Sequence, residues 1–152
     1  MQNEVAIRRI SIKDDLDAIC AQMQPEFWDE VNDMGSYEPE RLKYFLDRGG
    51  ILLVAYSGEK IVGVALCYDM PHPDATSYTL YVHELDTHPD FRRQGIASLL
   101  MNESFKLGKE RGVSEVWVST ETTNDPANAL YKKLGPDEIE PSITYSYNIK
   151  AS

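Results

Sequence analysis

Two adjacent arginines and a glycine stand where a short loop meets the start of a predicted helix. An apolar, β-rich run covers residues 78–85, a turn covers 86–90, and a helical pattern begins within Arg92-Arg93-Gln94-Gly95-Ile96-Ala97. The first turn of a helix leaves backbone N–H groups unpaired and carries partial positive charge, so phosphate groups bind there. Gly95 lets a ligand approach the backbone, and Arg92 and Arg93 add donors for phosphate oxygens. This pattern indicates a bound anion.

An alternative interpretation of the same residues stays open. The spacing matches neither the G-x-G-x-x-G of dinucleotide sites nor the G-x-x-x-x-G-K-[ST] of P-loops. A solvent-facing basic turn that begins an ordinary helix would show the same side chains. The residues alone therefore favour neither the anion site nor the basic turn.

Two motifs carry a resemblance to a known family. Arg92, Gly95 and Ala97 form R-x-x-G-x-A, which resembles the [QR]-x-x-G-x-[GA] signature of the GNAT acetyltransferases. Residues 124–135, N-D-P-A-N-A-L-Y-K-K-L-G, resemble the second family element, N-x-x-A-x-x-L-Y-x-K-x-G. Within the family, these motifs and the segment H-E-L-D-T look most like the type I aminoglycoside 3-N-acetyltransferases. The superfamily resemblance covers nearly the whole chain.

The resemblance implies a fold, a reaction and a co-substrate. The expected fold is α/β (α+β): one GNAT domain over residues 1–152, with a mixed, mostly antiparallel, splayed central sheet and helices on both faces. The expected reaction transfers acetyl from acetyl-CoA to a primary amine of an aminoglycoside, at its 3-N position, by direct attack in a ternary complex. Pantetheine would lie where strand 78–85 parts from strand 115–120. The acetyl-CoA contacts would fall on Leu85, Asp86, Thr87, Arg92, Arg93, Gln94, Gly95, Ile96, Ala97, Ser98, Asn124 and Tyr131.

Acetyl transfer needs an oxyanion donor, an acid for the leaving thiolate and a base for the amine. The family's usual oxyanion donor is a backbone N–H at the strand bulge, here near Leu85. Tyr131 is the acid candidate, since it occupies the tyrosine of the second family element; the alternative is a core tyrosine on a short helix. Asn124 opens the same helix, as a CoA contact, an N-cap, or both.

Glu84 is the base candidate, because it precedes Leu85 where the resembled enzymes carry an aspartate. Burial would raise its pKa toward the working pH. The alternative is a solvent-facing strand glutamate. His83 competes for the role, and both side chains point into the site only if a bulge turns one of them. His88, in the following loop, is expected to be exposed.

The acceptor expected from the resemblance is a small cationic amine, so acidic side chains are candidates to bind it. They are Asp29, Glu30, Asp33, Glu84, Asp125, Asp137 and Glu138. Trp28, in the same segment as the first of these, is expected in the core. The sequence departs from the family in reading Gly135-Pro136 where Gly-Phe is usual, and its N-terminal half matches the aminoglycoside enzymes only loosely.

Composition excludes several partners. Fifteen basic and 25 acidic residues give a net charge of −10, which argues against nucleic acid or an anionic membrane. The charge fits a cationic substrate or simple solubility. The chain starts without an apolar signal core, its longest apolar run is residues 51–56, and Cys20 and Cys67 are expected to be buried thiols, so a cytoplasmic location is expected. No His, Cys, Asp and Glu set has metal-ligand spacing, and no metal is expected.

The elements that would position these groups follow from periodicity and turn residues. Strands are expected at 5–10, 51–56, 61–68, 78–85, 115–120 and 143–149, and helices at 11–23, 39–48, 94–111 and 126–134. Two other functions stay open: acetylation of another amine (a polyamine, an amino acid or a protein terminus or lysine), and a non-catalytic acetyl-CoA-binding module. A homodimer is one alternative for the oligomeric state, because dimers are frequent in the resembled family.

Overall fold

The computed structural model describes residues 4–28 and 35–150. The chain divides into two compact units, residues 1–119 and 120–152, and each is described by itself. Asp29, Glu30 and Asp33, part of the predicted acceptor set, lie outside the described residues. The single domain expected from the sequence stays a prediction.

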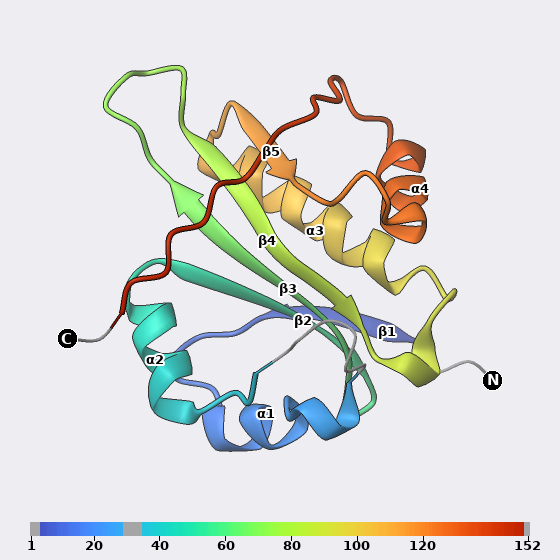
Figure 1. The fold of residues 1–152 in the computed structure, drawn as a ribbon. Coiled ribbons are helices and arrows are strands. Elements are labelled where there is room, and N and C mark those ends of the chain that lie inside the picture. The colour runs from blue at the N-terminus through green and yellow to red at the C-terminus, as the bar shows by residue number, and fades with distance from the viewer. Residues whose placement is uncertain (1–3, 29–34, 151–152) are drawn as a thin grey trace. The chain divides into compact units, whose positions relative to one another are not determined.

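A five-stranded sheet in the order β1-β2-β3-β4-β5 forms the centre of the first unit (Figure 1). The strands β1 (Val5–Arg9), β2 (Gly50–Ser57), β3 (Lys60–Met70) and β4 (Thr79–Thr87) pair antiparallel with their neighbours. The short β5 (Glu115–Val118) runs parallel to β4 at the edge. This arrangement confirms the predicted mixed, mostly antiparallel sheet.

Helices cover both faces of this sheet. Figure 1 shows α1 (Leu16–Gln22) and α2 (Pro39–Asp47) on one face and α3 (Ile96–Arg111) on the other. Because both faces are covered, β2 and the first part of β3 are continuous apolar runs rather than alternating ones. The expected helix 11–23 begins later than predicted, since Asp15 caps it by accepting a 3.0 Å hydrogen bond from the Ala18 N–H.

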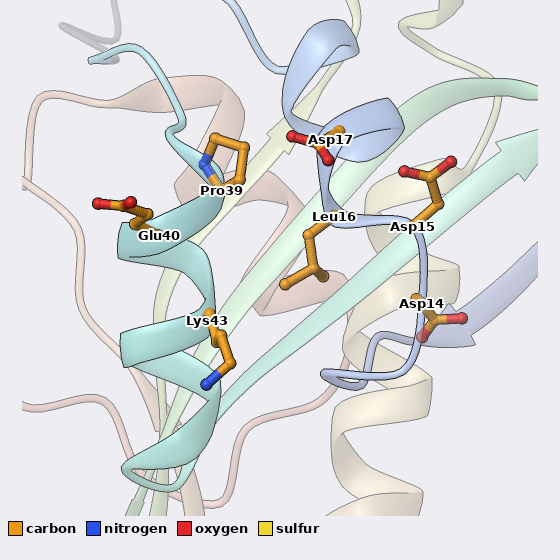
Figure 2. A pocket seen from close by; sticks show the side chains of 7 residues that line it. All are labelled: Asp14, Asp15, Leu16, Asp17, Pro39, Glu40 and Lys43. Carbon is orange, nitrogen blue, oxygen red and sulfur yellow. The ribbon is translucent and has the colours of Figure 1, made fainter.

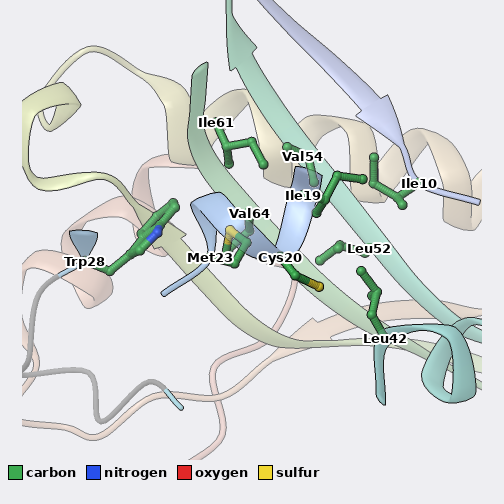
Figure 3. Close-up of a cluster of buried hydrophobic side chains, with 10 residues drawn as sticks. All are labelled: Ile10, Ile19, Cys20, Met23, Trp28, Leu42, Leu52, Val54, Ile61 and Val64. Atoms are coloured by element: carbon green, nitrogen blue, oxygen red, sulfur yellow. The ribbon is translucent and has the colours of Figure 1, made fainter. Parts of the chain in front are cut away.

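One apolar cluster fills the space between the sheet and the pair α1 and α2 (Figure 3). Its buried members are Ile10, Ile19, Cys20, Met23, Trp28, Leu42, Leu52, Val54, Ile61 and Val64. Trp28 is almost fully buried there, as predicted, and its indole N–H donates to the Gln22 carbonyl at 3.0 Å. Cys20 and Cys67 are both free and buried, which confirms the expected thiols.

Two glycines let α3 approach the opposite face of the sheet. A Cβ atom on Gly63 in β3 would lie 2.6 Å from Ile96 Cγ2, at the first turn of α3. A Cβ on Gly108, near the other end of the helix, would lie 2.6 Å from Val116 Cγ2. These distances are shorter than carbon atoms tolerate, so glycine at both positions sets the height of α3 above the sheet.

The second unit holds α4 (Asp125–Lys133), close to the predicted helix 126–134. The predicted strand 143–149 is wrong, since residues 139–150 form neither helix nor strand. Ile143, Tyr145, Tyr147 and Ile149, the apolar positions of its alternating pattern, are exposed. Alternation alone does not make a strand, because the backbone groups also need a neighbouring strand to bond. Among the helices that the structure describes, none is long and apolar enough to cross a membrane.

Candidate functional site

The predicted anion loop, residues 92–98, leads directly into α3. A short 3-10 turn (Pro89–Phe91) precedes it, and Gly95 stands at the N-cap with φ 79°. The Leu99 N–H bonds back to the Gly95 carbonyl at 3.1 Å, so the helical ladder begins there. The helix thus starts at Ile96, two residues after the predicted start at Gln94, because the left-handed Gly95 cannot be helical.

The geometry of this loop suits a phosphate group. The N–H groups of Ile96, Ala97 and Ser98 precede the first intrahelical bond, and the positive end of the dipole of a 16-residue helix lies with them. No described side chain caps this end, and a Cβ added at Gly95 would meet nothing within 4 Å. Arg92 and Arg93 stand beside these donors in the sequence.

His88 anchors the same loop and does not fit the prediction that it is exposed. Its relative exposure is only 9%, and its ring contacts Trp28 and Phe91 edge-on at centroid distances of 5.6 and 5.7 Å. Its Nδ1 accepts the Asp90 N–H at 3.2 Å. Burial first, and the Lys60 charge second, lower the pKa of His88, so a neutral ring holds the turn in place.

A bulge in β4 settles how His83 and Glu84 point. Leu66 of β3 lies opposite Glu84 and Cys67 lies opposite Val82, so His83 is an extra residue in β4 without its own opposite position. Directly opposite residues in an antiparallel pair share a face, as do residues two apart in one strand. Glu84 therefore shares a face with Leu66 and hence with Tyr68, and Tyr81 lies opposite Tyr68 on that same face.

We call Tyr68, Tyr81, His83 and Glu84 the β4 face. The His83 ring contacts the rings of Tyr68 and Tyr81 at centroid distances of 5.6 and 5.4 Å. Its Nε2 lies 4.0 Å from Glu84 Oε1, and its Nδ1 lies 3.3 Å from the Tyr81 hydroxyl oxygen. The two base candidates thus stand together, which strand alternation alone would have prevented.

The Glu84 side chain is 51% exposed. The prediction that this carboxylate is buried is therefore wrong. The carboxylate is open to solvent and to a ligand, and a base needs this access to the reacting amine.

Tyr37, which precedes α2, lies close enough to this region for the charges of Glu84 and Asp86 to act on its hydroxyl. The hydroxyl oxygen is buried and has no hydrogen-bond partner among the described residues. Burial raises the pKa of Tyr37 first, and the charges of Glu84 and Asp86 raise it further. Its backbone is fixed by the Met23 carbonyl at 3.3 Å and by the Gln24 side chain at 3.2 Å.

The sheet opens beside the same stretch of β4. β5 pairs with β4 only from Thr79 to Val82 and then ends at Val118, while β4 continues to Thr87. Beyond Val82, no strand of residues 4–28 and 35–150 pairs with this edge of β4. The opening is the splay expected between the two strands.

Backbone directions differ among Leu85, Asp86 and Thr87, three of the predicted acetyl-CoA contacts. The His88 N–H donates to the Val62 carbonyl of β3 at 2.9 Å, so by alternation the backbone groups of Asp86 also point to β3. Those of Leu85 and Thr87 point away from β3, toward the opening. The Thr87 N–H is bonded to Asp86 Oδ1 at 2.9 Å, so of these two the Leu85 N–H is better placed for the predicted role of oxyanion donor.

The remaining predicted residues belong to the second unit. Asn124 Oδ1 accepts the Ala127 N–H at 3.2 Å, which confirms Asn124 as the N-cap of α4. Asp125 lies in the first turn of α4, and Asp137 and Glu138 are exposed beyond it. Burial raises the pKa of Tyr131, so its phenol keeps its proton at neutral pH. The catalytic role of Tyr131 stays a prediction.

An acidic pocket lies elsewhere, between α1 and α2. Figure 2 shows its lining, which comprises Asp14, Asp15, Leu16, Asp17, Pro39, Glu40 and Lys43. None of these residues belongs to the predicted site. Within residues 4–28 and 35–150, no three His, Cys, Asp or Glu side chains are grouped to hold a metal ion.

Comparison with known proteins gives a family and a fold. The model of the acetyltransferase (GNAT) family matches residues 17–135. N-acetyltransferase 8 of Homo sapiens is 34% identical over 92 residues, 60% of this chain and 40% of that protein. N-alpha-acetyltransferase 30 of Schizosaccharomyces pombe is 32% identical over 82 residues, 54% of each protein. The chain therefore spans about half, or less, of the length of these relatives.

A solved structure resembles nearly the whole chain. It is the aminoglycoside acetyltransferase meta-AAC0020 from an uncultured soil metagenomic sample, in complex with sisomicin. The TM-score is 0.83 at 23% identity, covering 96% of this chain and 97% of that one. At this identity the likeness shows the fold alone.

Proposed function

Because this chain belongs to the acetyltransferase (GNAT) family, we propose that it transfers acetyl from acetyl-CoA to an amine of an aminoglycoside. One observation carries the proposal: the bulge that sets the Glu84 carboxylate beside the opening between β4 and β5. The reacting amine and the thioester would meet there. The 3-N position of the aminoglycoside belongs to the proposal and rests on the sequence resemblance.

The donor end of the site is built from backbone. The N–H groups at the start of α3 would hold the pyrophosphate of acetyl-CoA, with Arg92 and Arg93 as further donors. The absence of a side chain at Gly95 leaves room for the phosphate. The pantetheine would follow the open edge of β4, along the backbone groups of Leu85 and Thr87. Acetyl-CoA supplies the activated acyl group.

The reaction then needs a base, an oxyanion donor and an acid. Glu84 accepts the proton of the attacking amine as the new C–N bond forms, and the C–S bond breaks when the resulting tetrahedral intermediate collapses. The Leu85 N–H stabilises the oxyanion of the tetrahedral intermediate. Tyr131, which burial keeps protonated, gives its proton to the leaving thiolate. Asn124 would act as the cap of the helix that carries Tyr131. Carboxylates including Asp29, Glu30, Asp33, Asp125, Asp137 and Glu138 would bind the remaining ammonium groups of the acceptor.

Structural neighbours support an aminoglycoside as the acceptor, since several are aminoglycoside acetyltransferases. A protein N-terminus is the second candidate, because one relative is an N-alpha-acetyltransferase. A cytoplasmic location also belongs to the proposal, and the two free, buried cysteines agree with a reducing compartment. A homodimer is tested separately, by light scattering.

The experiment is release of free CoA thiol from acetyl-CoA, with gentamicin, kanamycin, spermidine and a peptide amine as acceptors. Turnover confined to the aminoglycosides supports the proposal, and NMR of the product then identifies the acetylated nitrogen. Turnover with the peptide amine alone would identify a protein N-terminus, and not an aminoglycoside, as the acceptor. Binding of acetyl-CoA without turnover of any acceptor would indicate a non-catalytic binding module and would contradict the proposal.

A further inference from the structure

Aromatic rings stand beside the proposed base on the β4 face. Tyr68 is 39% exposed, and the His83 side chain is 45% exposed. The Tyr81 ring stacks on Trp117 of β5 at a centroid distance of 4.0 Å and an interplanar angle of 19°. A solvent-accessible cluster of aromatic rings next to a carboxylate is an unusual surface, and it is unlike the acidic pocket between α1 and α2.

Neighbouring groups hold these rings in place. The Trp117 indole N–H donates to Thr79 Oγ1 at 3.2 Å, which fixes the partner on which Tyr81 stacks. The Tyr81 hydroxyl lies 3.3 Å from His83 Nδ1, and Tyr68 packs edge-on against Phe45 of α2 at 5.5 Å. Side chains fixed before binding lose little entropy when a ligand arrives, so a weak contact can still contribute to affinity.

Aromatic faces and carboxylates attract the same chemical group. The face of a tyrosine ring carries negative potential and binds ammonium groups, and a carboxylate binds them by charge. Glu84 can meet the amine that reacts, whereas the face of a tyrosine ring offers no atom that takes up a proton. The rings are therefore suited to an ammonium group that is held without reacting.

We propose that Tyr68 and Tyr81 hold a second ammonium group of the acceptor while the reacting amine lies at Glu84. This rests on the proposed function and narrows its acceptor to small molecules with several amines. The β4 bulge is the structural cause, since without it Tyr81 and Glu84, three residues apart, would point to opposite faces.

Neamine, an aminoglycoside core with several amines, is the probe. Its dissociation constant is measured by calorimetry, and its KM and kcat are measured by CoA release, for wild type, Tyr68→Leu and Tyr68→Phe. Leucine keeps an apolar side chain without the ring, whereas phenylalanine keeps the ring without the hydroxyl. Tyr44→Leu, at a tyrosine 53% exposed on α2 and outside the β4 face, is the matched control. Melting temperatures identify any variant that fails to fold.

We expect Tyr68→Leu to raise both the dissociation constant and the KM of neamine roughly threefold to thirtyfold, the range of a cation–π contact. Tyr68→Phe and Tyr44→Leu should stay close to wild type, and the KM for acetyl-CoA should not change. Wild-type neamine binding in Tyr68→Leu would overturn the proposal. So would an equal loss in Tyr68→Phe, since the hydroxyl would then be the contact, and so would a wild type that does not bind neamine.

The two proposals fail in different ways. If neamine binds through Tyr68 but neither neamine nor any aminoglycoside of the panel is acetylated, the proposed function is contradicted and the ammonium site is retained. If neamine is acetylated with the same KM by wild type and by Tyr68→Leu, the proposed function is supported and the proposed ammonium site is contradicted.

Discussion

The anion loop and the β4 face differ in what they are made of. The predicted anion loop consists of backbone features: a left-handed glycine, an uncapped helix start and open space beside that glycine. The β4 face consists of side chains: a carboxylate, a histidine and two tyrosines brought together by one bulge. A backbone site should tolerate most side-chain changes and fail when its geometry changes. A side-chain site should fail when a single functional group is replaced.

The largest effect is expected on the β4 face. Glu84→Gln removes the proposed base and should lower kcat about 100-fold to 10,000-fold, the usual contribution of a general base. The KM for acetyl-CoA should stay unchanged, because the donor end does not use this side chain. Glu110→Gln, an exposed glutamate of α3, is the control. Steady-state kinetics with the best acceptor of the panel measure both constants. An unchanged kcat in Glu84→Gln would show that Glu84 is not the base.

The anion loop should respond to geometry instead. Gly95→Ala places a Cβ where φ is 79°, which costs roughly 1–2 kcal/mol, and that Cβ fills the space left for the phosphate. Gly112 closes the same helix with φ 73°, so Gly112→Ala carries similar strain without touching the loop. Both variants should lose similar stability to urea, but only Gly95→Ala should raise the KM for acetyl-CoA. Equal KM values in the two variants would argue against the anion site.

A third pair of variants tests whether the height of α3 above the sheet matters for the donor end. Gly63→Ala drives a Cβ to 2.6 Å from Ile96 Cγ2 and should destabilise the protein by about 1–3 kcal/mol through overpacking. Gly108→Ala makes an equally short contact with Val116 at the far end of the helix. Urea unfolding should show similar losses, and the KM for acetyl-CoA should rise only for Gly63→Ala. A rise in both would mean that general loosening, not loop position, controls the donor site.

The smallest effect is a pH dependence from His88, which joins the loop to the core. Its pKa is lowered in the folded protein, so below about pH 6.5 the unfolded chain takes up a proton that the folded chain does not. This contribution to stability is present above that pH and is lost as the pH falls through the lowered pKa. His88→Asn keeps a capping acceptor but does not titrate, so it should lose less stability than wild type between pH 7.5 and 5.5. Urea unfolding at the two pH values measures the difference, and parallel losses would contradict it.

Local patterns alone predicted much of the fold. Apolar runs flanked by turn residues predicted β2, β3 and β4, and Gly112 marked the end of α3. The turn between β4 and α3 could also be predicted, because it depends on contiguous residues and on Gly95. Such features depend on neighbours in the chain, so the sequence contains the information to find them.

The features that were predicted wrongly depend on residues far away in the sequence. The segment 143–149 has the alternation of a strand, but the structure describes it as neither strand nor helix. His88 is buried by Trp28, which lies sixty residues earlier in the chain. Tyr37 and Tyr68 gave no signal as site residues, since nothing in their local sequence shows that they approach Glu84. A period-2 pattern of Tyr81 and His83 before an acidic residue was the one available hint.

The sequence by itself determined the family, the order of most elements and the glycine turn that begins α3, because each is encoded in short, contiguous patterns. Only the tertiary structure decided that His83 and Glu84 share a face, since that depends on how β4 registers against β3. It also decided that aromatic rings from two further strands stand beside the carboxylate. Register and sheet order are set by the burial of the whole core, and no local stretch of sequence contains them.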